Sequence, residues 1–166
     1  MAMIRTRSVG TTWAAIILLI VSLSAAAALG AEEKEDNRAI NWLGFNEALS
    51  QGRDFDKPAF LHFTAPWCKW CKKMQRETYK DPKVIRYLNE NFTAVMIDTE
   101  KLPALARKYR VESLPTLWFL DSQGKGLTNI KGYVGPEKLL RVLEYVSTKA
   151  YEKVDYQTWV RKHSAR

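Results

Sequence analysis

Cys68 and Cys71 are the only cysteines in this chain of 166 residues, and Lys69 and Trp70 separate them. An apolar stretch, 58–63, leads toward the first cysteine, and a helix-favouring stretch follows the second. This order predicts that Cys68 stands at the N-terminus of a helix, where unpaired backbone N–H groups and the helix dipole stabilise a thiolate. Cys71 lies one turn further on, near enough to close a small disulfide ring. The pair therefore has the chemistry of dithiol–disulfide exchange: one thiol ionises easily, and the second resolves a mixed disulfide.

The same cysteine spacing also occurs in zinc sites and in purely structural disulfides. A structural zinc site needs four ligands, usually two such pairs or one pair with two histidines. This chain has one pair, and its two histidines, His62 and His163, lie roughly a hundred positions apart. A redox dithiol is therefore the favoured interpretation, with a zinc site and a disulfide without turnover as the alternatives.

The hydrophobic pattern predicts the elements that position the two cysteines. Asp81, as N-cap before Pro82, and the pair Gly135-Pro136 mark the starts of two helices. Strands alternate with helices, and a hairpin and a closing helix follow, which predicts a three-layer α/β fold with a central mixed sheet. The predicted strands are 58–63, 92–98, 115–120 and about 128–133, and the predicted helices are 42–51, 68–78, 83–91, 102–109 and 137–148.

The first thirty residues have the pattern of a secretory signal peptide. Arg5 and Arg7 form a positive segment, 13–23 is almost entirely apolar, and Ala28-Leu29-Gly30 fits a cleavage site. An uncleaved anchor is the alternative, because 12–31 is about long enough to span a bilayer. The weakly hydrophobic alanines at its end favour cleavage.

After this segment, the sequence predicts a linker at 31–40, a folded domain at 41–150 and a C-terminal helical extension at 151–166. Asp155 is the predicted N-cap of the extension, and Tyr156, Trp159, Val160 and His163 follow with helical spacing. We expect the extension to pack on its own domain. The alternative is that its aromatic and basic face meets a partner or a membrane surface.

Export predicts a periplasmic location, with attachment to the inner membrane if the N-terminal segment stays uncleaved. Exported proteins usually carry several disulfides as staples, but this chain has a single cysteine pair, which leaves the thiols free to react. The formal charge of +8 is spread along the sequence without long Lys/Arg blocks. It favours acidic partners or a membrane surface slightly, and it does not indicate nucleic-acid binding.

The run Trp67-Cys68-Lys69-Trp70-Cys71-Lys72 after the first core strand, with Pro115-Thr116 opening a later one, resembles the thioredoxin superfamily. The resemblance extends over about 42–147. Within that superfamily, 63–74, 81–84 and 91–98 are most similar to exported single-domain members and to the thioredoxin-like end domain of bacterial transmembrane thiol–disulfide interchange proteins. The resemblance implies a thioredoxin fold, a central mixed β-sheet flanked by helices, followed here by a short C-terminal helical extension.

The resemblance also implies roles for residues around the pair. Cys68 is expected to be the attacking thiolate and Cys71 the resolving thiol, while Trp67 packs beside them and shields them. Pro115 matches the family's cis-proline, which faces the dithiol and lets the neighbouring backbone, at Leu114, pair with a substrate strand. An ordinary trans proline at the start of an edge strand is the alternative for Pro115.

Two departures from thioredoxin proper concern the dithiol directly. Lys69 and Trp70 replace the usual Gly-Pro between the cysteines, and we expect both to contact substrates. Lys69 adds a cation beside the Cys68 sulfur, which favours the thiolate unless the side chain points into water.

The second departure is His62. Thioredoxin proper has a buried aspartate at this position, which moves the proton of the resolving thiol, and a lysine where this chain has Ala94. An imidazole with an unperturbed pKa of about 6.5 can perform the same relay near neutrality. The alternative is that His62 only fills the core.

The sequence thus predicts an exported thiol–disulfide oxidoreductase that acts on protein substrates, as a reductant or exchange partner rather than a general oxidant. It needs no cofactor beyond the Cys68–Cys71 disulfide, and its expected partners are protein thiols and disulfides and a membrane-linked electron donor or acceptor. The alternative is a periplasmic chaperone-like or copper-binding module whose two thiolates bind Cu(I). The absence of a further Cys or Met cluster near the pair argues against it.

Overall fold

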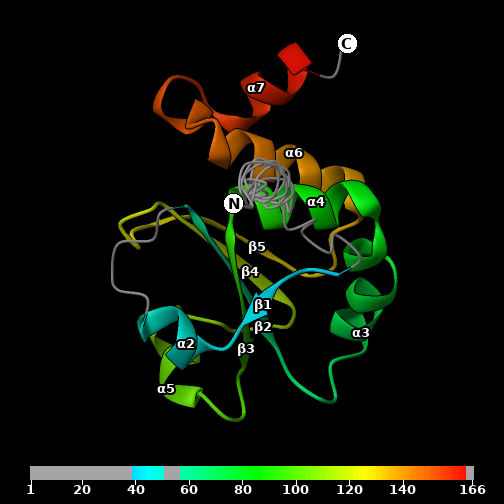
Figure 1. Cartoon of the computed structure of the whole chain (residues 1–166), viewed down its shortest axis with the longest axis vertical. Helices are drawn as coiled ribbons and strands as arrows, with labels where there is room; N and C mark the ends of the chain where they lie inside the picture. Colours follow the sequence, from blue (N-terminus) through cyan, green and yellow to red (C-terminus); the bar gives the residue numbers. More distant parts are fainter. Residues whose placement is uncertain (1–38, 51–56, 164–166) are drawn as a thin grey trace, which may run out of the picture. The chain divides into compact units, whose positions relative to one another are not determined.

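A computed structural model describes residues 39–50 and 57–163, without the side chains of residues 49 and 50 (Figure 1). The predicted signal peptide and most of the predicted linker lie outside the described residues. The strands are β1 (Trp42–Leu43), β2 (Ala59–Thr64), β3 (Thr93–Asp98), β4 (Thr116–Leu120) and β5 (Gly126–Lys131). The helices are α2 (Phe45–Ser50), α3 (Lys69–Arg76), α4 (Pro82–Asn91), α5 (Pro103–Lys108), α6 (Pro136–Ser147) and α7 (Tyr156–His163), with 3₁₀ turns η1 (Thr78–Lys80) and η2 (Ala150–Glu152).

The five strands form one mixed sheet in the order β1-β3-β2-β4-β5. β3 pairs in parallel with both β1 and β2, whereas β4 runs antiparallel to β2 and to β5. β2 is the central strand, and all six of its residues are buried. The predicted fold, a central mixed sheet flanked by helices, is confirmed.

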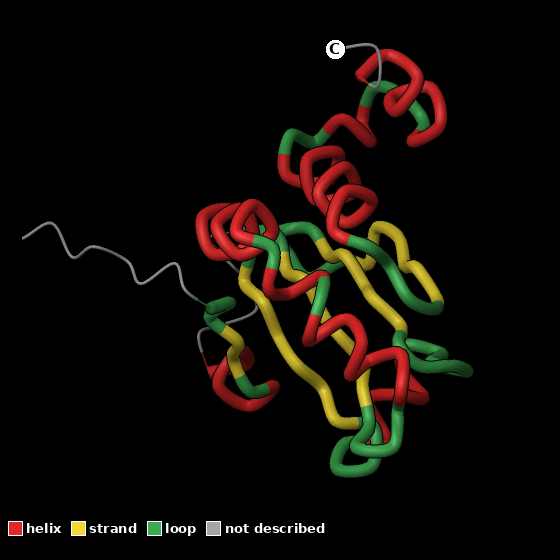
Figure 2. The backbone as a smooth tube through the Cα atoms, turned by 90° about the vertical axis from the view of Figure 1, so that its right-hand side faces the viewer, coloured by secondary structure: helices red, strands yellow, loops and turns green. Residues whose placement is uncertain are grey.

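Each face of the sheet has its own hydrophobic core. Phe60 of β2 and Leu117 of β4 pack with residues of α3, α4 and α6, whereas Leu61 and Phe63 point to the opposite face and pack with α2 and α5. Side chains alternate between the faces because successive residues of a strand point in opposite directions. Figure 2 is seen from the side of α3, which crosses in front of the yellow strands.

The predicted helix at 42–51 is wrong at its start. Trp42 and Leu43 form β1 and pair with Ala94 and Val95, and α2 begins only at Phe45. The helix-like spacing of Trp42 and Phe45 misleads because the two side chains pack against opposite faces of the sheet. A strand of two residues is also too short to show alternation. The predicted end of this helix lies outside the described residues.

The other boundaries lie within a few residues of the predictions, and the predicted caps are present. The carboxylate of Asp81 accepts hydrogen bonds from the backbone N–H groups of Lys83 and Val84, at 2.8 and 3.2 Å. β5 starts and ends two residues earlier than predicted. Gly132, which follows it, has a φ of +89°, a conformation that glycine adopts without steric cost and that ends the strand.

The C-terminal extension packs on its own domain, as expected. The carboxylate of Asp155 caps α7 by accepting the N–H of Thr158 at 2.9 Å. Trp159 is buried, and its ring contacts that of Tyr145 in α6 at 5.7 Å between centroids. In the part of the chain that the structure describes, no helix has the length and apolar character needed to cross a membrane.

His62 lies in the middle of β2, and none of its surface is exposed. Its ring contacts those of Trp42 and Tyr79, with centroids 6.0 and 5.3 Å away. Neither ring nitrogen has a hydrogen-bond partner, and neither does the buried hydroxyl of Tyr79. Burial lowers the pKa of His62 to about 3, because no neighbouring group compensates the imidazolium for its lost hydration. The imidazole is therefore neutral near pH 7.

We expect His62 to lower the free energy of unfolding as the pH falls from 6.5 toward 3. In this range the unfolded chain binds a proton at His62 and the folded protein does not, so protons favour unfolding. The slope from this one group approaches about 1.4 kcal/mol per pH unit. Urea unfolding of the wild type and of His62→Leu should show a steeper loss of stability in the wild type. Parallel curves for the two proteins would show that His62 takes up its proton in the folded state.

Candidate functional site

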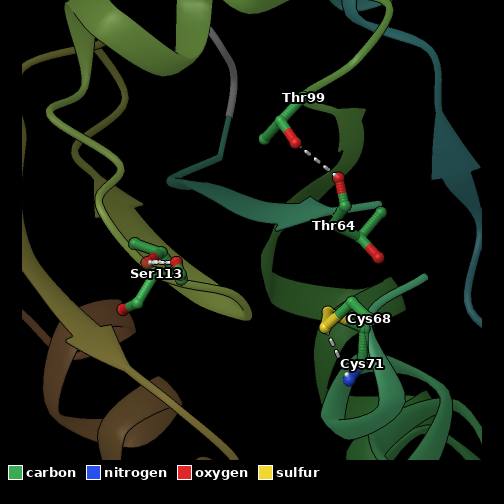
Figure 3. Close-up of a disulfide and its surroundings, with 6 residues drawn as sticks. Thr64, Cys68, Cys71, Thr99 and Ser113 are labelled. Atoms are coloured by element: carbon green, nitrogen blue, oxygen red, sulfur yellow. Dashed lines mark hydrogen bonds between the residues drawn. A yellow bond between two sulfur atoms is a disulfide. The ribbon is translucent and has the colours of Figure 1, made fainter. Parts of the chain in front are cut away.

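The two cysteines form a disulfide at the start of α3 (Figure 3). The S–S distance is 2.08 Å, and the Cα atoms are 5.3 Å apart. Cys68 is the N-cap residue of α3 and Cys71 lies in its first turn, so the predicted placement at a helix N-terminus is confirmed. Only 3% of Cys68 and 1% of Cys71 are exposed. Any partner must therefore approach the disulfide past its immediate neighbours.

The turn that carries Cys68 is fixed by the end of the central strand. The carbonyl of Thr64, the last residue of β2, accepts hydrogen bonds from the backbone N–H and the hydroxyl of Thr99, at 2.9 and 3.2 Å. The N–H of Cys68 donates to the carbonyl of Ala65 at 3.1 Å. Figure 3 shows the Thr99–Thr64 bond beside the disulfide. Hydrogen bonds at the end of the sheet therefore fix the position of Cys68, which does not lie on a free loop.

The electrostatic environment of the Cys68 sulfur suits a thiolate. The N–H of Cys71 donates to the Cys68 Sγ at 3.1 Å, as the side chain of an N-cap residue usually accepts. The same N–H and the positive end of the helix would stabilise an anionic sulfur after reduction of the disulfide. Lys69 is exposed in the first turn of α3 and brings a cation to the same end of the helix.

Pro115 follows a cis peptide bond with Leu114, as the resemblance implied. Thr116, the next residue, pairs with Phe63 in the antiparallel ladder of β4 and β2. Pro115 therefore lies at the end of β2 from which the chain leads to Cys68. Thr116 donates its hydroxyl proton to the carbonyl of Ser113 at 2.7 Å, which fixes this turn; Figure 3 shows Ser113 in the same close-up as the disulfide. Pairing of Leu114 with a substrate strand stays a prediction.

Trp67 and Trp70 are the exposed large hydrophobic residues of the described chain, at 65% and 56% exposure. The indole N–H of Trp67 donates to the carboxylate of Glu100 at 2.8 Å. The ring of Trp70 contacts that of Tyr133, with centroids 6.0 Å apart. These contacts hold both indoles in place and leave most of their surface exposed, at positions next to the two cysteines in the chain. The expected shielding of the cysteines by Trp67 stays a prediction.

A network of three side chains beside Trp70 was not predicted from the sequence. The Tyr133 hydroxyl donates to the carboxylate of Glu77 at 2.8 Å, and this bond raises the pKa of Tyr133. The ammonium of Lys73 lies 3.7 Å from the same carboxylate and 4.9 Å from the centre of the Tyr133 ring. The spacing of Lys73 and Glu77, one helical turn, was a visible signal, whereas nothing in the sequence linked either residue to Tyr133.

The structure does not join His62 to the dithiol by a hydrogen bond, since both of its ring nitrogens are without partners. It does place His62 on the face of β2 that also carries Phe60, which packs with Met74 of α3. Within residues 39–50 and 57–163, no three His, Cys, Asp or Glu side chains converge as they would to hold a metal ion.

Known proteins are similar to this chain in sequence. The curated relatives include a protein disulfide-isomerase of Ricinus communis, 28% identical over 140 residues, which are 82% of this chain and 27% of the relative. They also include a thiol:disulfide interchange protein, DsbD, of Salmonella typhi, 35% identical over 83 residues, which are 48% of this chain and 14% of the relative. The chain thus spans about a quarter or less of the length of these relatives.

Two solved structures show the same architecture. A thioredoxin from Thermus thermophilus superposes with a TM-score of 0.58 at 25% identity, covering 65% of this chain and 87% of that one. The DsbH oxidoreductase gives 0.57 at 23% identity, covering 76% of this chain and 98% of that one. The sequence model of the thioredoxin-like domain family matches residues 45–147, which is more than half of the chain. The chain therefore belongs to the thioredoxin-like domain family, with the disulfide of Cys68 and Cys71 at the start of α3.

Proposed function

We propose that this protein is an exported thiol–disulfide oxidoreductase that exchanges disulfides with protein substrates. The observation that carries the proposal is the Cys68–Cys71 disulfide at the N-terminus of α3, where a backbone N–H already points at the Cys68 sulfur. Relatives named as a disulfide isomerase and as a disulfide interchange protein support this activity. The signal-like pattern of residues 1–30 and the DsbD relatives support a periplasmic location.

The reaction begins from the reduced protein. The Cys68 thiolate attacks one sulfur of a substrate disulfide, so that a Cys68–substrate bond forms, the substrate S–S bond breaks, and the leaving thiolate takes up a proton. Cys71 then loses its proton and attacks the Cys68 sulfur, which releases the second substrate thiol and closes the Cys68–Cys71 disulfide. The substrate gains two electrons and the protein loses two. A membrane-linked electron donor returns the protein to its dithiol form.

The residues around the dithiol position the substrate. Trp67, Lys69 and Trp70 offer exposed surface on the side of α3. The turn at Leu114 and Pro115 lies at the same end of the sheet and offers its backbone to an extended substrate segment. An extended segment suits both surfaces, because its backbone can pair on one side while its side chains meet the indoles on the other.

His62 acts in this proposal as the proton carrier for Cys71. The neutral imidazole has a ring nitrogen free to accept a proton, and no other described side chain occupies it. Burial lowers the pKa of His62 to about 3, which makes the imidazole a weak base in the closed site. The relay therefore requires that substrate or water entering beside the dithiol raises this pKa as Cys71 loses its proton.

We expect the two cysteines to fail in different ways when replaced by serine. Cys68→Ser should abolish exchange, because no thiol remains at the helix N-terminus. Cys71→Ser should still attack but should accumulate as a mixed disulfide, because nothing resolves it. Gel mobility of the trapped complex with and without dithiothreitol measures this. Faster alkylation of Cys71 than of Cys68 by iodoacetamide in the reduced wild type would reverse the assigned roles.

We expect replacement of His62 to slow resolution while leaving the first attack nearly intact. His62→Leu fills the site without a base, and His62→Ala removes both the base and the packing. Both should lower the rate of resolution by about 10²-fold, the usual effect of losing a general base. His62→Asp, which restores a proton acceptor, should recover part of the rate. Stopped-flow measurement with a disulfide substrate separates the two steps.

A normal resolution rate in His62→Leu would show that His62 only fills the core. A loss confined to His62→Ala would lead to the same conclusion, because that variant alone leaves a cavity.

A further inference from the structure

The helix that carries the dithiol is strongly basic. Four of the eight residues of α3 are Lys69, Lys72, Lys73 and Arg76, and the helix has no acidic residue. Lys69, Lys72 and Arg76 are exposed. The N-terminus of the helix adds its own partial positive charge at the position of Cys68. Positive charge is therefore concentrated beside the two sulfur atoms.

The acidic groups next to this helix are already engaged by the protein itself. Glu77 accepts the hydroxyl of Tyr133 and lies 3.7 Å from the ammonium of Lys73. Glu100 accepts the indole N–H of Trp67. By contrast, Lys69, Lys72 and Arg76 form no hydrogen bond or ion pair through their side chains with any residue in the described ranges. The surface around the disulfide thus has cations without partners, whereas its carboxylates already accept hydrogen bonds from the protein.

A cavity beside this helix is also lined by more cations than anions. It has a volume of about 500 Å³ and opens next to the turn that leads to Cys68, with Pro66, Lys72, Gln75, Asp98 and Lys101 among its lining residues. Its two ammonium groups face one carboxylate, and the Asp98 carboxylate accepts the backbone N–H of Glu100 at 2.9 Å. An acidic side chain entering this cavity would meet two cations and one carboxylate, so the lining is positive on balance.

The exposed indoles supply the apolar part of the same surface. Trp67 precedes Cys68 and Trp70 precedes Cys71 in the chain, and contacts with Glu100 and Tyr133 hold their rings in place. Exposed aromatic rings that are already held in position bind a partner at a low cost in conformational entropy.

From this arrangement we infer that the preferred substrates are extended protein segments with acidic residues within a few positions of the reacting cysteine. The inference rests on the proposed exchange function and names the substrate class of the same site. Lys69 and Lys72 are each adjacent to one of the cysteines in the chain, so an acidic residue near the substrate cysteine comes close to them as the two sulfurs meet. Such charge pairs mainly raise the rate of association and weaken as salt is added.

Two matched peptides test the inference directly. Each carries one cysteine as a neutral methyl disulfide, and the two differ only in having Asp or Lys on both sides of that cysteine. The reduced protein converts each into the peptide thiol and methanethiol while its own dithiol becomes the Cys68–Cys71 disulfide, so atoms and electrons balance. The release of peptide thiol after acid quench, measured by chromatography, gives the rate.

We expect the Asp peptide to react about tenfold faster than the Lys peptide at about 10 mM salt, and the two rates to converge at about 1 M. The variant Lys69→Gln/Lys72→Gln should reduce this ratio several-fold. Lys162→Gln removes the same kind of charge from an exposed position on α7, which lies at the top of Figure 1 whereas α3 lies at its right, and should leave the ratio unchanged. The ratio cancels any effect of Lys69 on the thiolate itself, because both peptides meet the same thiolate.

Equal rates for the two peptides at low salt would overturn the inference and leave the exchange function standing. A ratio that Lys69→Gln/Lys72→Gln does not change would also overturn it, since the preference would then arise elsewhere. A failure to reduce either peptide would contradict the exchange function as well.

Discussion

The chemistry of this protein depends on one junction, the point at which the central strand of the sheet ends and α3 begins. Cys68 occupies the N-cap of that helix, and its sulfur accepts the N–H of Cys71. β2 is paired on both sides and buried along its whole length, so the junction is held by the most constrained strand of the fold. A sulfur on a flexible loop would meet the helix terminus only part of the time, whereas this one is kept there. The fold therefore supplies part of the stabilisation of the thiolate through the backbone of the helix itself.

His62 is an unusual residue in the core beside that junction. A fully buried imidazole without a hydrogen bond is unfavourable by about 1–3 kcal/mol relative to a satisfied or apolar side chain. Leucine would fit the same strand position and pack against the same aromatic rings. Packing alone therefore gives no reason for a histidine two residues before the end of the strand that leads to the dithiol. The proposed role in moving protons would give one, because an imidazole can accept a proton and leucine cannot.

The sequence was most informative where the signal was local. The helix start at Cys68, the cap at Asp81 and the cap at Asp155 each depend on residues within one turn, and all three are present. The short strand β1 was missed because it has only two residues and its side chains do not alternate visibly. The contacts of the side chains around the disulfide were also missed. Glu100 is 33 residues from its partner Trp67 in the chain, and Tyr133 is 56 residues from its partner Glu77. Only the packing of the whole domain brings such residues together, and no local sequence pattern predicts their contacts.

The surface around the disulfide is not explained by folding. Two largely exposed indoles leave apolar area in water that burial would remove at about 25 cal/mol per Å². Lys69, Lys72 and Arg76 lie on consecutive turns of one short helix, repel one another and have no partner among the described acidic residues. Both features lower the stability of the isolated domain slightly, and both are concentrated next to the two sulfur atoms. A binding partner that is apolar and negatively charged would compensate both at once, and the site of reaction is where such a partner has to dock.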